Sequence, residues 1–150
     1  MFFNKGKEMR SLTSKRLERA NAPRVACPYC EQDTQCVPGK EIYPHHKALY
    51  SLNFYLCKPC NAFCGCHKGT LNPLGSPANA ELREARKKAH RAFDELWKDK
   101  HMPSRTQAYR WLSEKTGVPP AKCHIAMFDV ETCGNVVAAV DKYWENISVF

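Results

Sequence analysis

The stretch that decides the fold opens with CPYC at residues 27–30 and closes with CKPC at residues 57–60, with 26 residues between the two motifs. The two-residue gap of a CxxC turn lets both sulfurs face one point, so two such turns complete a tetrahedron around a metal ion. One CxxC is equally typical of a redox pair, but two of them flanking strand-like sequence indicate a zinc ribbon. The sequence therefore predicts one structural Zn²⁺ held by Cys27, Cys30, Cys57 and Cys60, with no open position for catalysis.

The segments around these turns predict short strands. They read RVACPYC (24–30), TQCVPGKEIY (34–43) and SLNFYLCKPC (51–60), and they are broken by Pro38-Gly39 and by the cysteine turns. Pieces of this length bury too little apolar surface to fold alone, so the metal must supply stability.

The second half of the chain predicts helices. Apolar residues recur at helical spacing from Ala80 to Lys98, and Asn79 is placed to cap the first turn. Ser104 and Gln107 form a capping box, and the helix that follows should stop near Gly117. A final amphipathic helix includes Val136 and Trp144, while CHIAMFDV (123–130) predicts either a short strand or a helical turn.

Composition sets the class of protein and its compartment. The chain has 150 residues, is 43% hydrophobic and carries a formal net charge of +8. Its longest apolar runs are too short to span a bilayer, and the N-terminus lacks the apolar stretch of an export signal, so we expect no membrane contact and a cytoplasmic location. Nine cysteines in a reducing compartment favour metal binding over disulfides.

These patterns combine into an expected α+β fold, in which small zinc-ribbon β-hairpins pack against about three helices. We predict a basic flexible arm over residues 1–24, the zinc ribbon over 25–69, and a helical region over 70–150 that packs on the ribbon to make one compact domain. The arm has seven basic and two acidic residues, which suits either a solvated tail or contacts with phosphate.

A second metal site is a weaker expectation. Cys66 and His67 follow the final knuckle directly, and Cys123 with His124 would complete four ligands if the helical half folded over the ribbon. The spacing matches no common four-ligand pattern, and a free cysteine is often a small buried hydrophobe. We therefore favour a single zinc ion.

Several strings resemble an uncharacterised zinc-finger-containing domain family of bacterial and phage proteins. They are CPYC (27–30), IYP (42–44), LCKPCNAFCGCHKGTLNPLG (56–75), ANAELREARKKAHRAFDELW (78–97), AYRWLSEKTG (108–117) and CHIAMFD (123–129). The resemblance covers roughly residues 25–134 and includes the family's Gly-Cys-His, its Pro-Leu-Gly turn and its Arg-rich helix with His90 and Asp94. It implies the zinc and the domain boundaries, but no activity.

We favour a non-enzymatic binding module whose partner is nucleic acid or, alternatively, an acidic host protein that the module binds and modulates. The expected contacts are the basic residues of the first long helix, namely Arg83, Arg86, Lys87, Lys88 and Arg91. Aromatic residues of the ribbon are candidates for stacking on single strands, although most of them should cover its small core; they are Tyr29, Tyr43, Phe54, Tyr55 and Phe63.

Two further hypotheses remain open. A metal-dependent nuclease of the His/Asn finger type would use His46 beside Asn53, or a cluster of His67, His90, Asp94 and His124. Residues 111–128 are also similar to a helix-turn-helix unit, but the apolar side chains of their last element suit core packing better.

Overall fold

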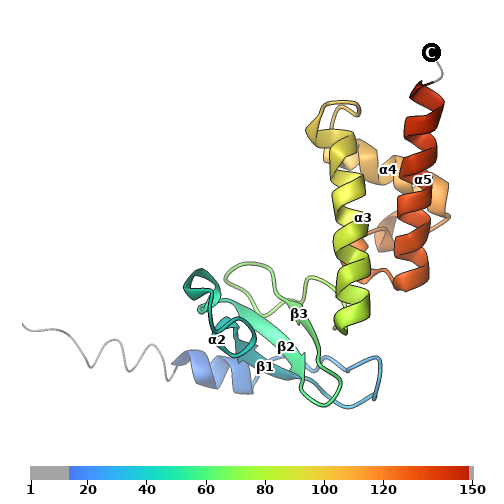
Figure 1. Ribbon diagram of the computed structural model, residues 1–150. Coiled ribbons are helices and arrows are strands. Elements are labelled where there is room, and N and C mark those ends of the chain that lie inside the picture. The colour runs from blue at the N-terminus through green and yellow to red at the C-terminus, as the bar shows by residue number, and fades with distance from the viewer. Residues whose placement is uncertain (1–13, 149–150) are drawn as a thin grey trace, which may run out of the picture. The chain divides into compact units, whose positions relative to one another are not determined.

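The computed structural model describes residues 14–148 and divides the chain into two compact units, one ending at Pro77 and the other beginning at Ala78 (Figure 1). The sequence predicts a boundary after Gly69 and a single compact domain. The boundary lies later because residues 70–77 belong to the ribbon. Asn53 Nδ2 donates to the Thr70 carbonyl at 3.0 Å, and the Tyr55 hydroxyl donates to the Leu71 carbonyl at 2.5 Å.

The first unit is a three-stranded antiparallel sheet in the order β1-β2-β3, where β1 is Gln35–Pro38, β2 is Asn53–Cys57 and β3 is Ala62–Gly65. The register places Cys36 opposite Tyr55, and Tyr55 opposite Cys64. Side chains alternate between faces along a strand, so these three residues lie on one face, while Phe54 and Phe63 lie on the other. This arrangement confirms the α+β class predicted from sequence.

Each face of the sheet has its own small core. On one side, the Tyr43 ring meets Phe54 and Phe63 edge-on, with centroids 5.8 and 6.0 Å apart. On the other side, Tyr55 is 1% exposed. The ribbon aromatics therefore fill its interior as expected, apart from Tyr29, which is 43% exposed.

Three details of the predicted strands are wrong. RVACPYC makes only the isolated bridge Ala26↔Asp33, because its cysteine turn bends the chain. The GKEI part of the second segment forms the short helix α2 (Gly39–Ile42), and residues Lys47–Leu49 add a 3₁₀ turn, η1. The third strand, β3, lies just beyond the three segments that were predicted to form strands. Gly39 is needed at the start of α2, because a Cβ there would collide with the Leu49 carbonyl oxygen.

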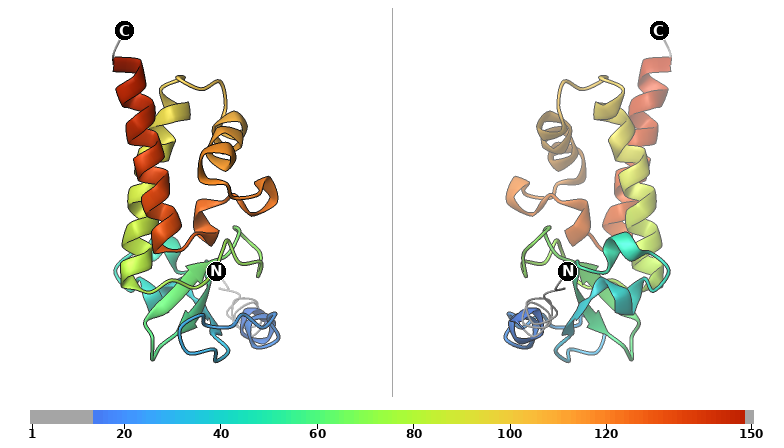
Figure 2. Two further views of the ribbon diagram at one scale, coloured as in Figure 1. Left: turned by 90° about the vertical axis from the view of Figure 1, so that its right-hand side faces the viewer. Right: turned by 90° about the vertical axis from the view of Figure 1, so that its left-hand side faces the viewer.

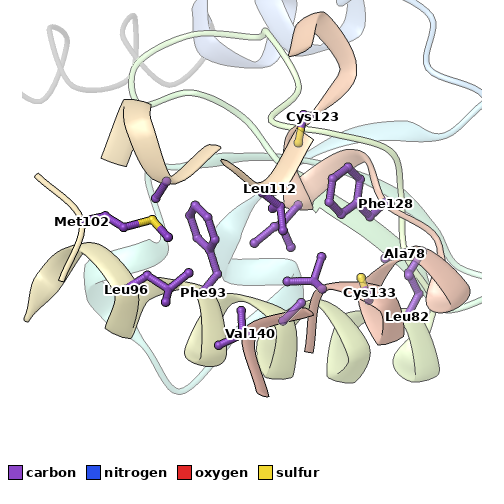
Figure 3. Close-up of a cluster of buried hydrophobic side chains, with 14 residues drawn as sticks. Ala78, Leu82, Phe93, Leu96, Met102, Leu112, Cys123, Phe128, Cys133 and Val140 are labelled. Atoms are coloured by element: carbon purple, nitrogen blue, oxygen red, sulfur yellow. The ribbon is translucent and has the colours of Figure 1, made fainter. Parts of the chain in front are cut away.

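The second unit is helical, with α3 (Ala80–Lys98), α4 (Arg105–Thr116) and α5 (Val130–Ser148) joined by the 3₁₀ turns η2 (Pro120–Lys122) and η3 (Ile125–Met127). Helices α3 and α5 run side by side in the same direction (Figure 2). Their buried stripes and α4 enclose one core, which includes Leu82, Phe93, Leu96, Leu112, Cys133 and Val140 (Figure 3).

The helix ends occur where the sequence predicted them. Asn79 Oδ1 accepts from the Leu82 N–H at 3.0 Å, and Ser104 Oγ accepts from the Gln107 N–H at 3.2 Å. Helix α4 ends at Gly117, whose φ of 75° is the left-handed conformation that glycine adopts at no cost. The CHIAMFDV segment forms a 3₁₀ turn rather than a recognition helix. Ile125 and Phe128 are buried, which confirms their core role, whereas Met127 is 55% exposed.

The predicted basic arm is partly structured. Residues 14–20 are helical, and Arg19 Nε donates to Asn53 Oδ1 at 2.8 Å, which ties this helix to β2. The flexibility of the arm stays a prediction, and residues 1–13 lie outside the described part of the chain. Within residues 14–148, no helix is both long and apolar enough to cross a bilayer.

Candidate metal centre and neighbouring residues

The four predicted ligands converge on one point. The Sγ atoms of Cys27, Cys30, Cys57 and Cys60 all lie within 4.8 Å of one another, and Cys30 Sγ is 3.7 Å from Cys57 Sγ. A tetrahedral site with Zn–S bonds of about 2.3 Å has sulfur atoms about 3.8 Å apart, whereas a disulfide would need about 2.05 Å. The cluster therefore has the dimensions of a four-thiolate zinc site and not of a redox pair.

The two knuckles share one feature of backbone conformation, although the hydrogen bonds that close their turns differ. The residue after the second cysteine of each turn is left-handed, with φ of 63° at Glu31 and 50° at Asn61. The Glu31 N–H donates to the Cys27 carbonyl at 2.8 Å, and the Asn61 N–H donates to the Lys58 carbonyl at 3.1 Å. Asparagine tolerates this conformation better than glutamate does. The sequence analysis did not anticipate this repeated turn, because neither position is glycine.

The electrostatics of the metal-free cluster call for a cation. Burial raises the pKa of Cys27, but backbone N–H groups of Tyr29 and Cys30 that donate to its sulfur outweigh burial and leave the pKa at about 7. Burial, together with the interactions of Cys60 with the other three sulfurs, raises the pKa of Cys60 to about 12. One thiolate therefore forms readily, but four adjacent thiolates require a positive charge among them. A divalent metal supplies that charge, and with four ligands bound it keeps no open position.

The residues proposed for a second site fall into both units. Cys66 is half-buried beside β3, and burial, then the nearby Cys36, raise its pKa to about 11, while His67 is exposed. Cys123 is 1% exposed within the helical core, where its thiol lies 3.9 Å from the Tyr109 carbonyl, whereas His124 is exposed. Cys123 thus behaves as a buried hydrophobe. Among residues 14–148, the four knuckle cysteines form the one such convergent group of potential ligands.

The ribbon residues considered for nuclease chemistry have other roles in the structure. His46 is exposed, and its ring lies edge-on to Tyr43 at 6.1 Å. Asn53, the proposed partner of His46, uses its side-chain amide to join Arg19 to the Thr70 carbonyl. This amide is therefore engaged in holding the ribbon together.

The second nuclease candidate, the pair His90 and Asp94, lies one turn apart on α3. Asp94 Oδ1 accepts from Trp97 Nε1 at 3.2 Å, and Asp94 Oδ2 lies 3.6 Å from Lys98 Nζ. Burial lowers the pKa of His90, with smaller effects from Asp94, which raises it, and from Arg105, which lowers it. The carboxylate therefore stabilises the end of α3, and the histidine is held in its neutral form.

The five basic residues of α3 that were predicted as partner contacts separate into two groups. Arg83 Nη1 donates to the Ala78 carbonyl at 2.7 Å, and Arg86 Nε donates to the Phe128 carbonyl at 3.0 Å, so both guanidinium groups brace the helical unit. Lys87, Lys88 and Arg91 are exposed. We call these three residues the α3 basic cluster. It is bounded one turn away on either side by the exposed residues Glu84 and Glu95.

A groove between α4 and α5 was not predicted from the sequence. Its volume is about 430 Å³, and it is lined by Trp111, Lys115, Thr116, Asn135, Ala138, Ala139, Lys142, Tyr143 and Asn146. The sequence contains a weak signal for it, because the α5 residues recur at helical spacing along one flank of the buried valine stripe. Their partners on α4 lie 19 to 35 residues earlier in the chain, so only the fold brings them together.

Comparison with known families supports the metal assignment. The model of a zinc-finger-containing domain family matches residues 23–143, which include all four cysteines and most of the helical unit. Comparisons with curated proteins and with solved structures give no match. The matched family and the sulfur geometry agree on one structural zinc ion.

Proposed function

Because the chain belongs to the zinc-finger-containing domain family, we propose that its zinc-stabilised fold serves as a binding module for nucleic acid. The zinc site is closed, so it organises the ribbon and leaves recognition to the surrounding surface. We place the module in the cytoplasm, where reduced thiols remain available to the metal.

The α3 basic cluster carries this proposal. Lys87, Lys88 and Arg91 are exposed, and within residues 14–148 they form no hydrogen bond or ion pair. They project from a helix whose other face is anchored in the core by Phe93 and Leu96, so their backbone is held in place. Three cations on a rigid helix suit phosphate contacts, and the net charge of +8 favours association with a polyanion.

The test compares two triple variants of the full chain. K87Q/K88Q/R91Q removes the cluster, and K47Q/K68Q/K122Q removes the same charge from exposed lysines elsewhere. Binding of labelled single- and double-stranded DNA and RNA is followed by fluorescence anisotropy against salt. On duplex DNA, the logarithm of the binding constant falls linearly with the logarithm of the salt concentration, and each phosphate contact contributes about 0.9 to the magnitude of this slope. We therefore expect the first variant to reduce the magnitude of the slope by up to about 2.7.

Equal slopes for the two variants would remove the cluster from the interface. If the unmodified chain retains no nucleic acid at about 50 mM salt, where phosphate contacts are strong, the proposal fails. An acidic protein partner would then be the remaining explanation for the exposed charge. Cleavage of the labelled strands in the presence of magnesium would instead reopen the nuclease hypothesis.

A further inference from the structure

The groove between α4 and α5 combines the groups that recognise an unpaired nucleotide. Trp111 and Tyr143 contribute two aromatic rings, whose centroids lie 5.5 Å apart at 72°. Lys115 and Lys142 contribute cations, and both are exposed. The remaining polar groups include the amides of two asparagines. We propose, resting on the nucleic-acid function above, that this groove binds a segment of single-stranded nucleic acid.

Charge is the first argument for this ligand. The nine residues that line the groove include two lysines and no aspartate or glutamate. The acidic residues of this part of α5, Asp141 and Glu145, are exposed but do not line it. An anionic ligand is therefore favoured inside the groove, although α5 as a whole is not basic.

The aromatic rings and the amides distinguish a single strand from a duplex. Stacking rings need a free base face, and amide groups need a free base edge, and both are accessible only where the strand is unpaired. Asn135 and Asn146 are exposed on α5 and can offer both a donor and an acceptor. A volume of about 430 Å³ also suits a ligand of small-molecule size and not the width of a duplex.

The spacing of the lining residues gives the groove a direction. Asn135, Ala138, Lys142 and Asn146 recur every three or four residues, so they form a stripe about 16 Å long on α5. The two alanines leave room for a ligand to approach the helix closely. Further rings lie beyond the groove. The ring centroid of Trp144 is 5.3 Å from that of Tyr143 and 4.6 Å from that of His101. These rings extend the aromatic surface of the helical unit beyond the groove.

The experiment measures binding of the full chain to a labelled oligothymidine and to a duplex of the same length. The variant K115Q/K142Q removes the groove cations, and K47Q/K122Q removes the same charge from exposed positions outside it. We expect the groove variant to lower the salt slope on the single strand by about 1.4, since each contact with single-stranded phosphate contributes about 0.7. The control variant should leave that slope unchanged.

Three further variants test the aromatic ring and the shape of the groove. Trp111→Leu should weaken single-strand binding roughly tenfold without changing the salt slope, and Trp111→Phe should restore most of the affinity, because a base stacks on either ring. Ala138→Leu adds bulk at an exposed helical position and should weaken binding without changing charge. If Trp111→Leu fails to fold, the groove assignment is tested by K115Q/K142Q and by Ala138→Leu, because substitutions at these exposed positions should not disturb folding.

The outcomes separate the two proposals. If K87Q/K88Q/R91Q weakens binding while all the groove variants bind normally, the nucleic-acid function stands and the groove assignment is overturned. Equal salt slopes for K115Q/K142Q and K47Q/K122Q also overturn it. If the unmodified chain binds neither single strands nor duplex at low salt, both proposals fail.

Discussion

Replacing Cys60 by serine tests the zinc site through its effect on folding. The hydrophobic cluster at the site contains only Cys27, Cys57 and Ala62 as buried residues, so it offers little apolar burial to replace the metal. Structural zinc in small finger domains contributes about 10–16 kcal/mol. The total stability of a small domain is about 5–15 kcal/mol. Losing one of four thiolates should therefore unfold the ribbon unit.

The two units can be followed separately in one sample. All three tryptophans, Trp97, Trp111 and Trp144, belong to the helical unit, so tryptophan fluorescence reports that unit alone. The ribbon is followed through zinc content and through the rate at which its thiols react with a disulfide reagent. For Cys60→Ser we expect no zinc after washing with a weak chelator and fast-reacting ribbon thiols, while the urea transition seen by tryptophan remains.

Cys36→Ser is the matched control, because Cys36 lies on β1 outside the four-cysteine cluster. It should keep one equivalent of zinc per chain. The reasoning is refuted if Cys60→Ser also keeps one equivalent with slowly reacting thiols, or if Cys36→Ser loses the metal to the same extent. Two equivalents in the unmodified chain would establish a second site and revive the hypothesis around Cys66 and His67.

Three other predictions address packing, backbone and pH. Phe93→Ala should destabilise the helical unit by about 3–5 kcal/mol, because the Phe93 side chain is 0% exposed and its loss leaves a cavity. The measurement is urea unfolding followed by tryptophan fluorescence, and a loss below about 1 kcal/mol would contradict the burial of Phe93 in the core. Gly39→Ala should lower the free energy of unfolding of the ribbon by about 1–3 kcal/mol, because the new methyl group collides with the Leu49 carbonyl oxygen. It should also speed the release of zinc to a chelator. At Gly134 of α5 an added methyl group meets open space, so Gly134→Ala should instead stabilise the helical unit by about 0.5–1 kcal/mol. The reasoning fails if both glycine substitutions change the free energy of unfolding in the same direction. Burial lowers the pKa of His90 from 6.5, so the contribution of the neutral imidazole to stability is complete above pH 6.5 and is lost as the pH falls through the lowered pKa. His90→Gln should therefore reduce the loss of stability between about pH 7 and 5, measured as the midpoint of urea unfolding. If the pH dependence of the variant is unchanged, the titrating group lies elsewhere.

Local sequence was sufficient for the features that depend on neighbouring residues. The two CxxC motifs identified all four ligands, because their spacing alone sets which sulfurs can share a metal. The limits of α3 and α4 followed from Asn79, Ser104 and Gly117, since capping is a contact within three or four residues. The buried stripe of α3 followed from helical periodicity.

Features that depend on distant residues were missed or misassigned. Arg83 and Arg86 looked like surface charges, but the fold brings the Phe128 carbonyl to Arg86, and this contact spans 42 residues. Arg19 looked like part of a mobile arm, yet it meets Asn53 across 34 residues. Asn53 matched part of the nuclease motif, and its amide joins Arg19 to the Thr70 carbonyl, a role that the motif does not predict. A hydrogen-bond partner at such a distance leaves no periodic pattern in the sequence.

The sequence by itself therefore determined the metal, its ligands and the helices, because these follow from spacing over a few residues. Only the tertiary structure decided which charges remain exposed, where the ribbon ends and that α4 and α5 enclose a groove without acidic residues. Those properties depend on which segments pack together. Packing is a sum over many long-range contacts, and no short motif encodes it.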